Sequence, residues 1–184
     1  MKGFIEMFVT YNARNFNSFV NSKNLHKVPF GSNNTSEVEL KVKKLDAKAT
    51  LPFYATEGAA GMDLTALTRD PIVIKPGEVK FVPTGLAFEI PKGYEMQIRA
   101  RSSMGKRGLI PAAAVGTIDS DFRGGLAVME RNISNHPITI GNKQRFCQIL
   151  LKPVPGIKIK ETDTFSETKR GKKGVGSTDK NINR

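Results

Sequence analysis

A group of anion-binding side chains lies in residues 99–108. Arg99, Arg101, Ser102 and Ser103 supply two guanidiniums and two hydroxyls, and the turn Gly105-Lys106-Arg107-Gly108 follows them. Guanidinium groups bind phosphate oxygens through paired N–H donors, and a glycine-flexed backbone can form an anion-binding concavity. The segment therefore predicts a phosphate cradle, with a solvated basic loop as the alternative interpretation.

A second candidate lies in residues 115–125, where an apolar run ends at Asp119 and a glycine-rich turn leads into the next run. A hairpin of this kind can present backbone N–H and C=O groups to a flat base edge, and Phe122 can pack against a sugar. Asp119 is a candidate general base for a water molecule. Because Asp and Gly are common in turns, an ordinary hairpin with polar turn residues is the alternative interpretation.

A third candidate, residues 169–178, holds three glycines, four cations and two hydroxyls. It resembles a P-loop in composition only, because it lacks the Gly-Lys-Ser/Thr order and no helix follows it. We therefore reject a nucleoside-triphosphatase P-loop and interpret the segment as an anion-binding strand.

Short strands separated by turns must position these groups. Several strands with a turn about every ten residues are typical of an all-β sandwich or barrel. Only residues 104–107 could form a short helical turn. The predicted strands are residues 38–42, 72–74, 79–90 with an interruption at 83–85, 95–99, 125–133, 136–140 and 146–154.

The chain divides into three parts by composition. Residues 1–36 are rich in Asn and lack a sustained hydrophobic period, which predicts a flexible N-terminal extension; a mitochondrial presequence is the alternative, although the segment has little Arg and weak amphipathicity. Residues 37–161 carry the strand pattern and form the expected β domain. Residues 162–184 are rich in Lys, Gly, Ser and Thr, cannot bury a core, and are expected to be a mobile tail unless a ligand orders them.

The charge of the chain favours an anionic ligand. Lys and Arg number 29 against 17 Asp and Glu in 184 residues, a net charge of +12. This excess is spread along the sequence, whereas a DNA-binding arm is more often one contiguous tail, so nucleic acid is the less favoured partner. No apolar stretch is long enough for a membrane helix. The single Cys147 is typical of a reducing compartment, and we expect an intracellular protein, cytoplasmic or nuclear.

Five segments in this order resemble the five motifs of the homotrimeric dUTPases, and the resemblance covers residues 38 to about 179. The segments are residues 60–64 (AGMDL), 101–105 (RSSMG), 116–124 (GTIDSDFRG), 145–148 (RFCQ) and 170–178 (RGKKGVGST). The resemblance implies a jelly-roll-like β barrel that hydrolyses dUTP to dUMP and pyrophosphate with Mg²⁺ bridging the phosphates. It also implies a homotrimer in which each active site takes the first, second and fourth motifs from one chain, the hairpin from another and the tail from the third.

The resemblance implies the following roles at the base, the sugar and the reacting water. Asp119 corresponds to the carboxylate that deprotonates the water attacking the α-phosphorus. Phe122 corresponds to an aromatic residue, usually Tyr, that stacks on the deoxyribose and excludes a 2′-hydroxyl. Gly116 and Ala127 correspond to positions whose main chain reads uracil, and Ala113 stands where many members have Asn.

The resemblance also implies the phosphate contacts. These correspond to Arg101, Ser102, Ser103 and Gln148 in the body and to Arg170, Ser177 and Thr178 in the tail, and a Gly often stands where Ser103 is. Asp63 corresponds to a carboxylate near the metal's water shell, and its alternative role is to stabilise a turn. Val175 replaces a Phe that stacks on uracil and Asp179 replaces a Gly, so we expect a looser lid with an intact fixed site.

Three other functions remain open at this point. The fold is shared with dCTP deaminase, in which a Glu usually stands where Asp119 is, and a bifunctional enzyme that converts dCTP to dUMP is a related possibility. A third reading is a non-catalytic protein in which the nucleotide gates contact with a macromolecular partner. Asp119 and the tail pattern favour the release of pyrophosphate.

Overall fold

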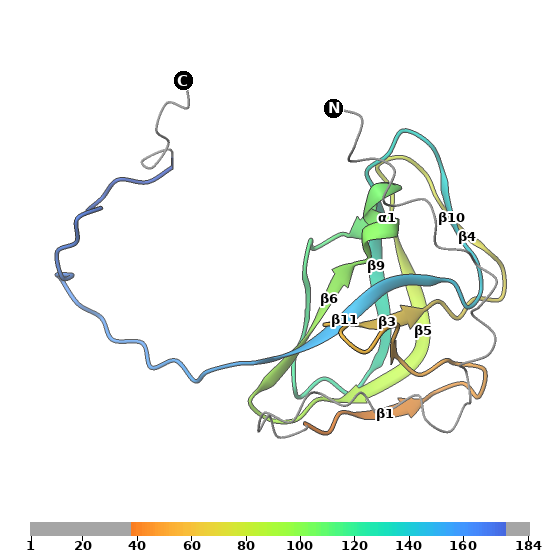
Figure 1. Ribbon diagram of the computed structural model, residues 1–184, viewed down its shortest axis with the longest axis horizontal. Helices are drawn as coiled ribbons and strands as arrows, with labels where there is room; N and C mark the ends of the chain where they lie inside the picture. Colours follow the sequence, from red (N-terminus) through yellow and green to blue (C-terminus); the bar gives the residue numbers. More distant parts are fainter. Residues whose placement is uncertain (1–37, 176–184) are drawn as a thin grey trace.

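The computed structural model describes residues 38–175, a body of two larger β-sheets and one two-stranded sheet from which a long C-terminal arm departs (Figure 1). Four antiparallel strands form the first sheet in the order β1-β5-β9-β7. These strands are β1 (Lys41–Lys44), β5 (Val79–Glu89), β9 (Gly125–Asn132) and β7 (Leu109–Pro111).

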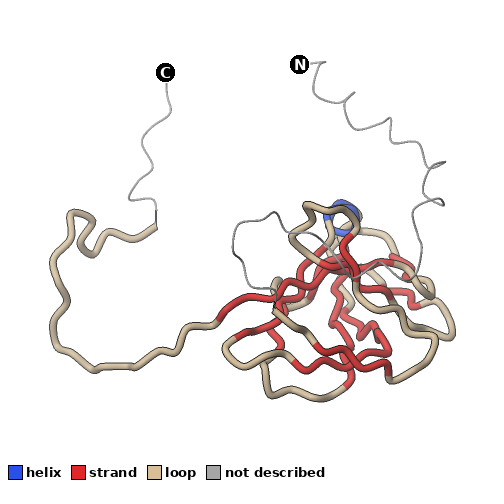
Figure 2. The backbone as a smooth tube through the Cα atoms, turned by 60° about the horizontal axis from the view of Figure 1, so that its bottom comes forward, coloured by secondary structure: helices blue, strands red, loops and turns tan. Residues whose placement is uncertain are grey.

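The second sheet has five antiparallel strands in the order β2-β3-β11-β6-β8. They are β2 (Phe53–Tyr54), β3 (Met62–Thr65), β11 (Arg145–Pro153), β6 (Tyr94–Ala100) and β8 (Gly116–Ile118). A separate pair joins β10 (Ile138–Ile140) to β4 (Ile72–Ile74). Among the described residues the one helix is α1 (Ser102–Lys106), which lies at the rim of the body (Figure 2).

Alternation of side chains in the strands builds one shared core. Along β9 every second residue is buried, so Leu126 and Val128 point inward while Ala127 and Met129 are exposed. This is the period expected of a strand with one face on a core. Buried side chains from both sheets form the hydrophobic cluster, including Val82 of β5 and Ile149 of β11. The all-β prediction is confirmed.

The strand bounds agree with the sequence analysis in most places and differ in a few. Residues 72–74 form β4 as predicted, whereas the predicted interruption at residues 83–85 is a shift of register inside a continuous β5. Gly85 permits this shift because its φ is +70°, and a Cβ there would clash with the Leu67 side chain. The helical turn begins at Ser102, two residues earlier than predicted. The short strands β2, β3 and β7 were not predicted.

The C-terminal arm leaves the body after β11. Every described residue from 154 to 175 is exposed, and the arm extends away from both sheets (Figures 1 and 2). Three of its apolar residues, Ile157, Ile159 and Phe165, are 85–90% exposed. The predicted extension, residues 1–36, and the predicted site residues Ser177 and Thr178 lie outside the described residues. No described helix is long and apolar enough to cross a membrane.

Glu130 is the most unusual residue of the core. It lies on the inward face of β9, its exposed fraction is 0%, and neither carboxylate oxygen has a hydrogen-bond partner within residues 38–175. Burial raises its pKa to about 8. The same environment raises the pKa of the Cys147 thiol, first through burial and then through the nearby carboxylate of Glu130. We conclude that Glu130 is protonated in the folded protein at neutral pH.

The buried carboxyl predicts a pH-dependent stability. Below the ordinary pKa of 4.5 Glu130 is neutral in both states and imposes no ionisation penalty; as the pH rises toward about 8, the folded state keeps a proton that the unfolded chain releases. Stability is therefore lost across this window, by about 1.4 kcal/mol per pH unit. We expect Glu130→Gln to flatten the decline in urea unfolding measured from pH 5 to 8 at fixed protein concentration. An equally steep decline in Glu130→Gln would contradict this account.

Candidate active site

The first part of the site is a buried carboxylate that holds two arginines. Asp63 of β3 has a side chain only 8% exposed and accepts from Arg101 Nε at 2.8 Å and from Arg145 Nη1 at 3.1 Å. Arg101 also donates from Nη1 to the Arg145 carbonyl at 3.2 Å. Charge-assisted contacts of this kind fix the plane of a guanidinium. The direction of Arg101 is therefore set by its neighbours before any ligand binds.

A polar hollow of about 300 Å³ opens beside these groups. It is lined by Asp63, Arg101, Ser102, Ser103 and Gln148, so the structure brings the first, second and fourth predicted segments together. The Gln148 side chain donates from Nε2 to the Ala100 carbonyl at 2.9 Å. Both hydroxyl residues lie at the exposed start of α1. Cationic and hydroxyl donors around an open polar hollow suit phosphate oxygens.

Gly61 makes room for the amide of Gln148. A Cβ at Gly61 would lie 2.5 Å from Gln148 Oε1 and 3.1 Å from Leu150 Cδ1. Gln148 is paired across the strands with Asp63, which places its side chain beside the polar hollow. The glycine is thus required by a close approach, and its φ is not in the left-handed region.

The second part of the site is the turn between β8 and β9. Asp119 follows β8 directly and is exposed, and its carbonyl accepts from the Phe122 N–H at 3.2 Å. Arg123 closes the turn by donating from Nη1 to the carbonyls of Ser120 at 2.6 Å and Phe122 at 3.0 Å. The Phe122 ring lies against Gly124, where a Cβ would be 2.6 Å from Cζ. The turn therefore fixes the backbone that carries the carboxylate and the ring.

A second hollow, of about 190 Å³, lies between β8 and β9. Gly116, Ala113 and Ala127 line it, with the apolar Ile98 and Pro111. The outer edge of β8 has no strand partner among the described residues, and β7 pairs only with the last three residues of β9. Backbone N–H and C=O groups in this hollow are therefore available to a ligand with a flat hydrogen-bonding edge.

The loop that enters this hollow is strained. Ala114 has a φ of +61°, and the Val115 N–H donates to the Ala113 carbonyl at 2.7 Å. This is a γ-turn with a positive central φ, which is rare and unfavourable for a residue with a Cβ. The strained residue lies beside the free backbone edge, one residue after Ala113, where many family members have Asn.

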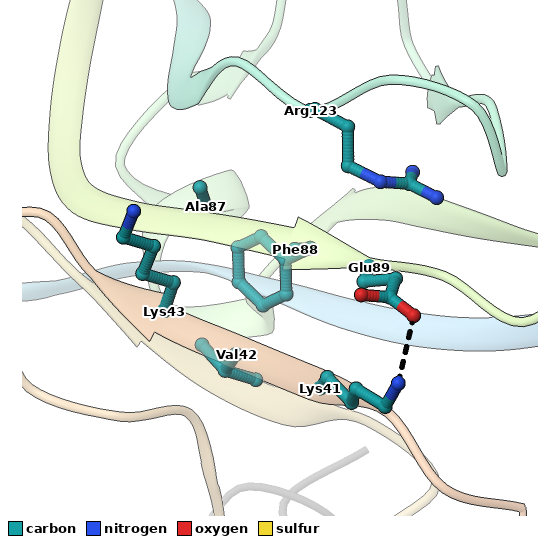
Figure 3. Close-up of a pocket in the computed structure, with 7 residues that line it drawn as sticks. All are labelled: Lys41, Val42, Lys43, Ala87, Phe88, Glu89 and Arg123. Atoms are coloured by element: carbon teal, nitrogen blue, oxygen red, sulfur yellow. Dashed lines mark hydrogen bonds and ion pairs between the residues drawn. The ribbon is translucent and has the colours of Figure 1, made fainter.

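A third hollow, of about 310 Å³, is lined by residues of β1, by the end of β5 and by Arg123 of the turn (Figure 3). Arg123 reaches over it from the hairpin, while Lys41 and Lys43 come from β1. Lys41 pairs with Glu89 at 2.9 Å, an exposed contact worth little in free energy. No predicted site residue lines this hollow, and its cations add to the positive field around the hairpin.

Comparison with known proteins agrees with this arrangement. Residues 47–179, more than half of the chain, match the dUTPase family model.

The chain belongs to the dUTPase family.

Two curated relatives illustrate the match. The deoxyuridine 5′-triphosphate nucleotidohydrolase of Nautilia profundicola is 45% identical over 144 residues, which cover 78% of this chain and 100% of that protein. The Rickettsia bellii protein of the same name is 44% identical over 142 residues, which cover 76% of this chain and 95% of that protein.

Solved dUTPases share the fold. The Staphylococcus bacteriophage 80alpha dUTPase with dUpNHpp is 25% identical, with a TM-score of 0.68 over 80% of this chain and 99% of that one. A mutant dUTPase of the S. aureus phage phi11, described with a structural Mg(II) ion, is 20% identical, with a TM-score of 0.63 over 71% of this chain and 100% of that one. The predicted jelly-roll-like dUTPase fold is confirmed.

The predicted site residues of this dUTPase fall into separate groups in one chain. The phosphate-type residues line one hollow, and Gly116 and Ala127 line another that shares no lining residue with it. Arg170 lies on the exposed arm, where it donates to the Lys173 carbonyl at 3.1 Å. The sequence analysis gave no role to Arg145, although it begins the fourth motif segment, residues 145–148.

Gly61 provides a direct test of the polar hollow. We expect Gly61→Ala to weaken the binding of dUpNHpp about three- to tenfold, because the new methyl group displaces the Gln148 amide. The melting temperature is expected to change little, because the end of a flexible side chain can move aside. Gly58→Ala is the matched control, since a Cβ there meets no atom within 4 Å. Equal affinities in the two variants, measured by calorimetry, would show that Gln148 does not bind phosphate.

Proposed function

We propose that this chain hydrolyses dUTP to dUMP and pyrophosphate. The observation that carries the proposal is the free backbone edge between β8 and β9, which lies next to a turn bearing Asp119 and Phe122. A nucleotide base can complete hydrogen bonds that strand pairing leaves open there. The names of the curated relatives, deoxyuridine 5′-triphosphate nucleotidohydrolases, support dUTP as the substrate.

The polar hollow is proposed to hold the triphosphate. Arg101 supplies charged donors, Ser102 and Ser103 supply hydroxyls at the start of α1, and Gln148 supplies an amide. Arg170, Ser177 and Thr178 are proposed to close over the terminal phosphate from the tail. Because the hollow is open and polar, it can admit a highly charged group without removing all of its water.

The hairpin is proposed to select the base and the sugar. The main chain at Gly116 and Ala127 would read the edge of uracil, which offers both donors and acceptors. A Cβ added at Gly116 would lie 3.1 Å from the Ile98 Cβ. A side chain at this position would therefore crowd the hollow. Phe122, which is 43% exposed, would cover the face of the deoxyribose and leave no room for a 2′-hydroxyl.

Asp119 is proposed to activate the water. Its carboxylate takes a proton from the water as the water oxygen bonds to the α-phosphorus. The bond from the α-phosphorus to the bridging oxygen then breaks, and pyrophosphate leaves with that electron pair. Asp119 is exposed at the end of β8, so a water molecule can reach it directly.

Mg²⁺ is proposed to enter with the nucleotide, as part of the substrate. Within residues 38–175 no group of three or more His, Cys, Asp or Glu side chains could hold a metal ion. Asp63, the predicted neighbour of the metal's water shell, instead directs each of its oxygens at a guanidinium. Mg²⁺ in nucleotide sites is commonly held by substrate phosphates, and there it neutralises part of their charge.

We propose a homotrimer with shared sites, as the family resemblance implies. Phe81 of β5 and Met129 of β9 are direct cross-strand neighbours and are 63% and 43% exposed. Adjacent exposed apolar side chains are typical of an interaction surface. The exposed arm and the separation of the two hollows within one chain also favour sites completed by neighbouring copies.

Asp119→Asn tests the proposed base. The substitution keeps size and hydrogen-bonding reach but removes the proton acceptor, so we expect kcat to fall by about 10² or more. Affinity for dUpNHpp is expected to stay near that of the wild type. Asp121→Asn in the same exposed turn is the control and should retain turnover. Pyrophosphate release measures both, and near-wild-type turnover in Asp119→Asn would refute its role.

Sugar selection tests the hairpin. We expect kcat/KM for UTP to be about 10²-fold below that for dUTP, because the Phe122 ring occupies the space of a 2′-hydroxyl. Phe122→Ala should bring kcat/KM for UTP closer to that for dUTP, while Phe122→Tyr, which keeps the ring, should preserve the difference. Comparable kcat/KM values for UTP and dUTP in the wild type would show that the role proposed for Phe122 is wrong.

A further inference from the structure

Three residues, Asp63, Arg101 and Arg145, form a cluster in which each contacts the other two, and we call this cluster the clamp. Two contacts join the carboxylate to the two guanidiniums, and a third joins Arg101 Nη1 to the Arg145 carbonyl. These contacts use two of the five N–H donors of Arg101 and leave three for a ligand. A free arginine samples many rotamers, so a clamp of this kind removes that freedom before binding.

The charge of the cluster depends on Arg145. Asp63 alone would cancel the charge of Arg101 and leave a neutral hollow. Arg145 adds a second positive charge, so the three side chains together carry a formal charge of +1 beside Ser102 and Gln148. The clamp can therefore orient Arg101 without removing the attraction for an anion.

A β-bulge places Arg145 in this position. The pairing of β11 with β3 shifts between Arg145 and Cys147, so Arg145 lies opposite Thr65 while Gln148 lies opposite Asp63. Thr65 and Asp63 are two residues apart and share a face of the strand. The bulge thus brings Arg145 to the face of Gln148, and it lets both Phe146 and Cys147 be buried.

We propose that Arg145 is a positioning residue for the triphosphate: together with Asp63 it fixes the direction of Arg101 and keeps the phosphate hollow cationic. This inference rests on the proposed function, and it gives Asp63 the task of orienting the two arginines. Arg145 does not line the hollow itself, so its effect is transmitted through Asp63 and through the field.

The experiment compares Arg145→Gln with Arg69→Gln. Both remove one positive charge, but Arg69 is exposed in a loop and lies outside the hollow. Affinities for dUpNHpp, dUMP and inorganic tripolyphosphate are measured by calorimetry with Mg²⁺. We expect Arg145→Gln to weaken the binding of dUpNHpp and tripolyphosphate about tenfold and the binding of dUMP much less. Its melting temperature should be close to that of Arg69→Gln. Arg145→Lys should recover part of the loss.

Asp63→Asn is tested alone, combined with Arg145→Gln, and across a Mg²⁺ titration. We expect the loss of dUpNHpp affinity in the double variant to be smaller than the sum of the two single losses, because both substitutions break the same clamp. The Mg²⁺ concentration at half-maximal turnover should stay at the wild-type value. A shifted Mg²⁺ midpoint with unchanged affinity for tripolyphosphate would overturn the assignment of Asp63.

Other outcomes separate this inference from the proposed function. Equal affinities for tripolyphosphate in Arg145→Gln and Arg69→Gln would overturn the inference even if dUTP is hydrolysed. Tripolyphosphate binding that depends on Arg145, without dUTP turnover, would support the clamp and reject the proposed reaction. A wild-type chain that binds neither tripolyphosphate nor dUpNHpp would overturn both.

Discussion

Backbone hydrogen bonding in β9 is the constraint on which the rest of this structure depends. A buried backbone group without a partner is costly, so a strand in the middle of a sheet is normally paired on both edges. Here β5 pairs with one edge of β9, but β7 pairs only with its last three residues. The first half of β9 and the outer edge of β8 are left facing a hollow. A ligand with a flat polar edge can supply the missing hydrogen bonds, and this makes base recognition a property of the main chain.

The electrostatics of the polar hollow beside Asp63 and Arg101 follow a second constraint. A site for a triphosphate needs positive charge, yet long cationic side chains lose much conformational entropy when a ligand immobilises them. Asp63 reduces that cost by holding two guanidiniums in advance, with a side chain only 8% exposed. One carboxylate against two arginines retains a positive charge. The β-bulge in β11 lets one carboxylate contact two arginines, because a regular register would place Arg145 opposite the residue that follows Thr65.

Much of the fold could be predicted from the sequence, because alternation and turn residues identify strands such as β4 and β9. The motif residues were assigned through the resemblance to the dUTPase motifs. Three features could not be found this way. The bulge that changes the face on which Arg145 lies depends on pairing between distant strands. The free edge of β9 depends on where β7 ends. The burial of Glu130 depends on which face of β9 meets the core. Each is a tertiary property of a residue whose local sequence is unremarkable.

Glu130 connects these features, because it lies on the same strand as Ala127 but on the opposite face. Its side chain enters the core between the sheets, where neither oxygen has a partner within residues 38–175, whereas Ala127 faces the hollow. An apolar side chain of similar size would avoid the desolvation cost, so the carboxyl lowers the stability of the strand that presents the backbone edge. Stability of the first sheet must then come from its other contacts. The exposed Phe81–Met129 pair on the outer face of β5 and β9 is a surface that a second copy can bury, and burial there would stabilise the strand that Glu130 weakens.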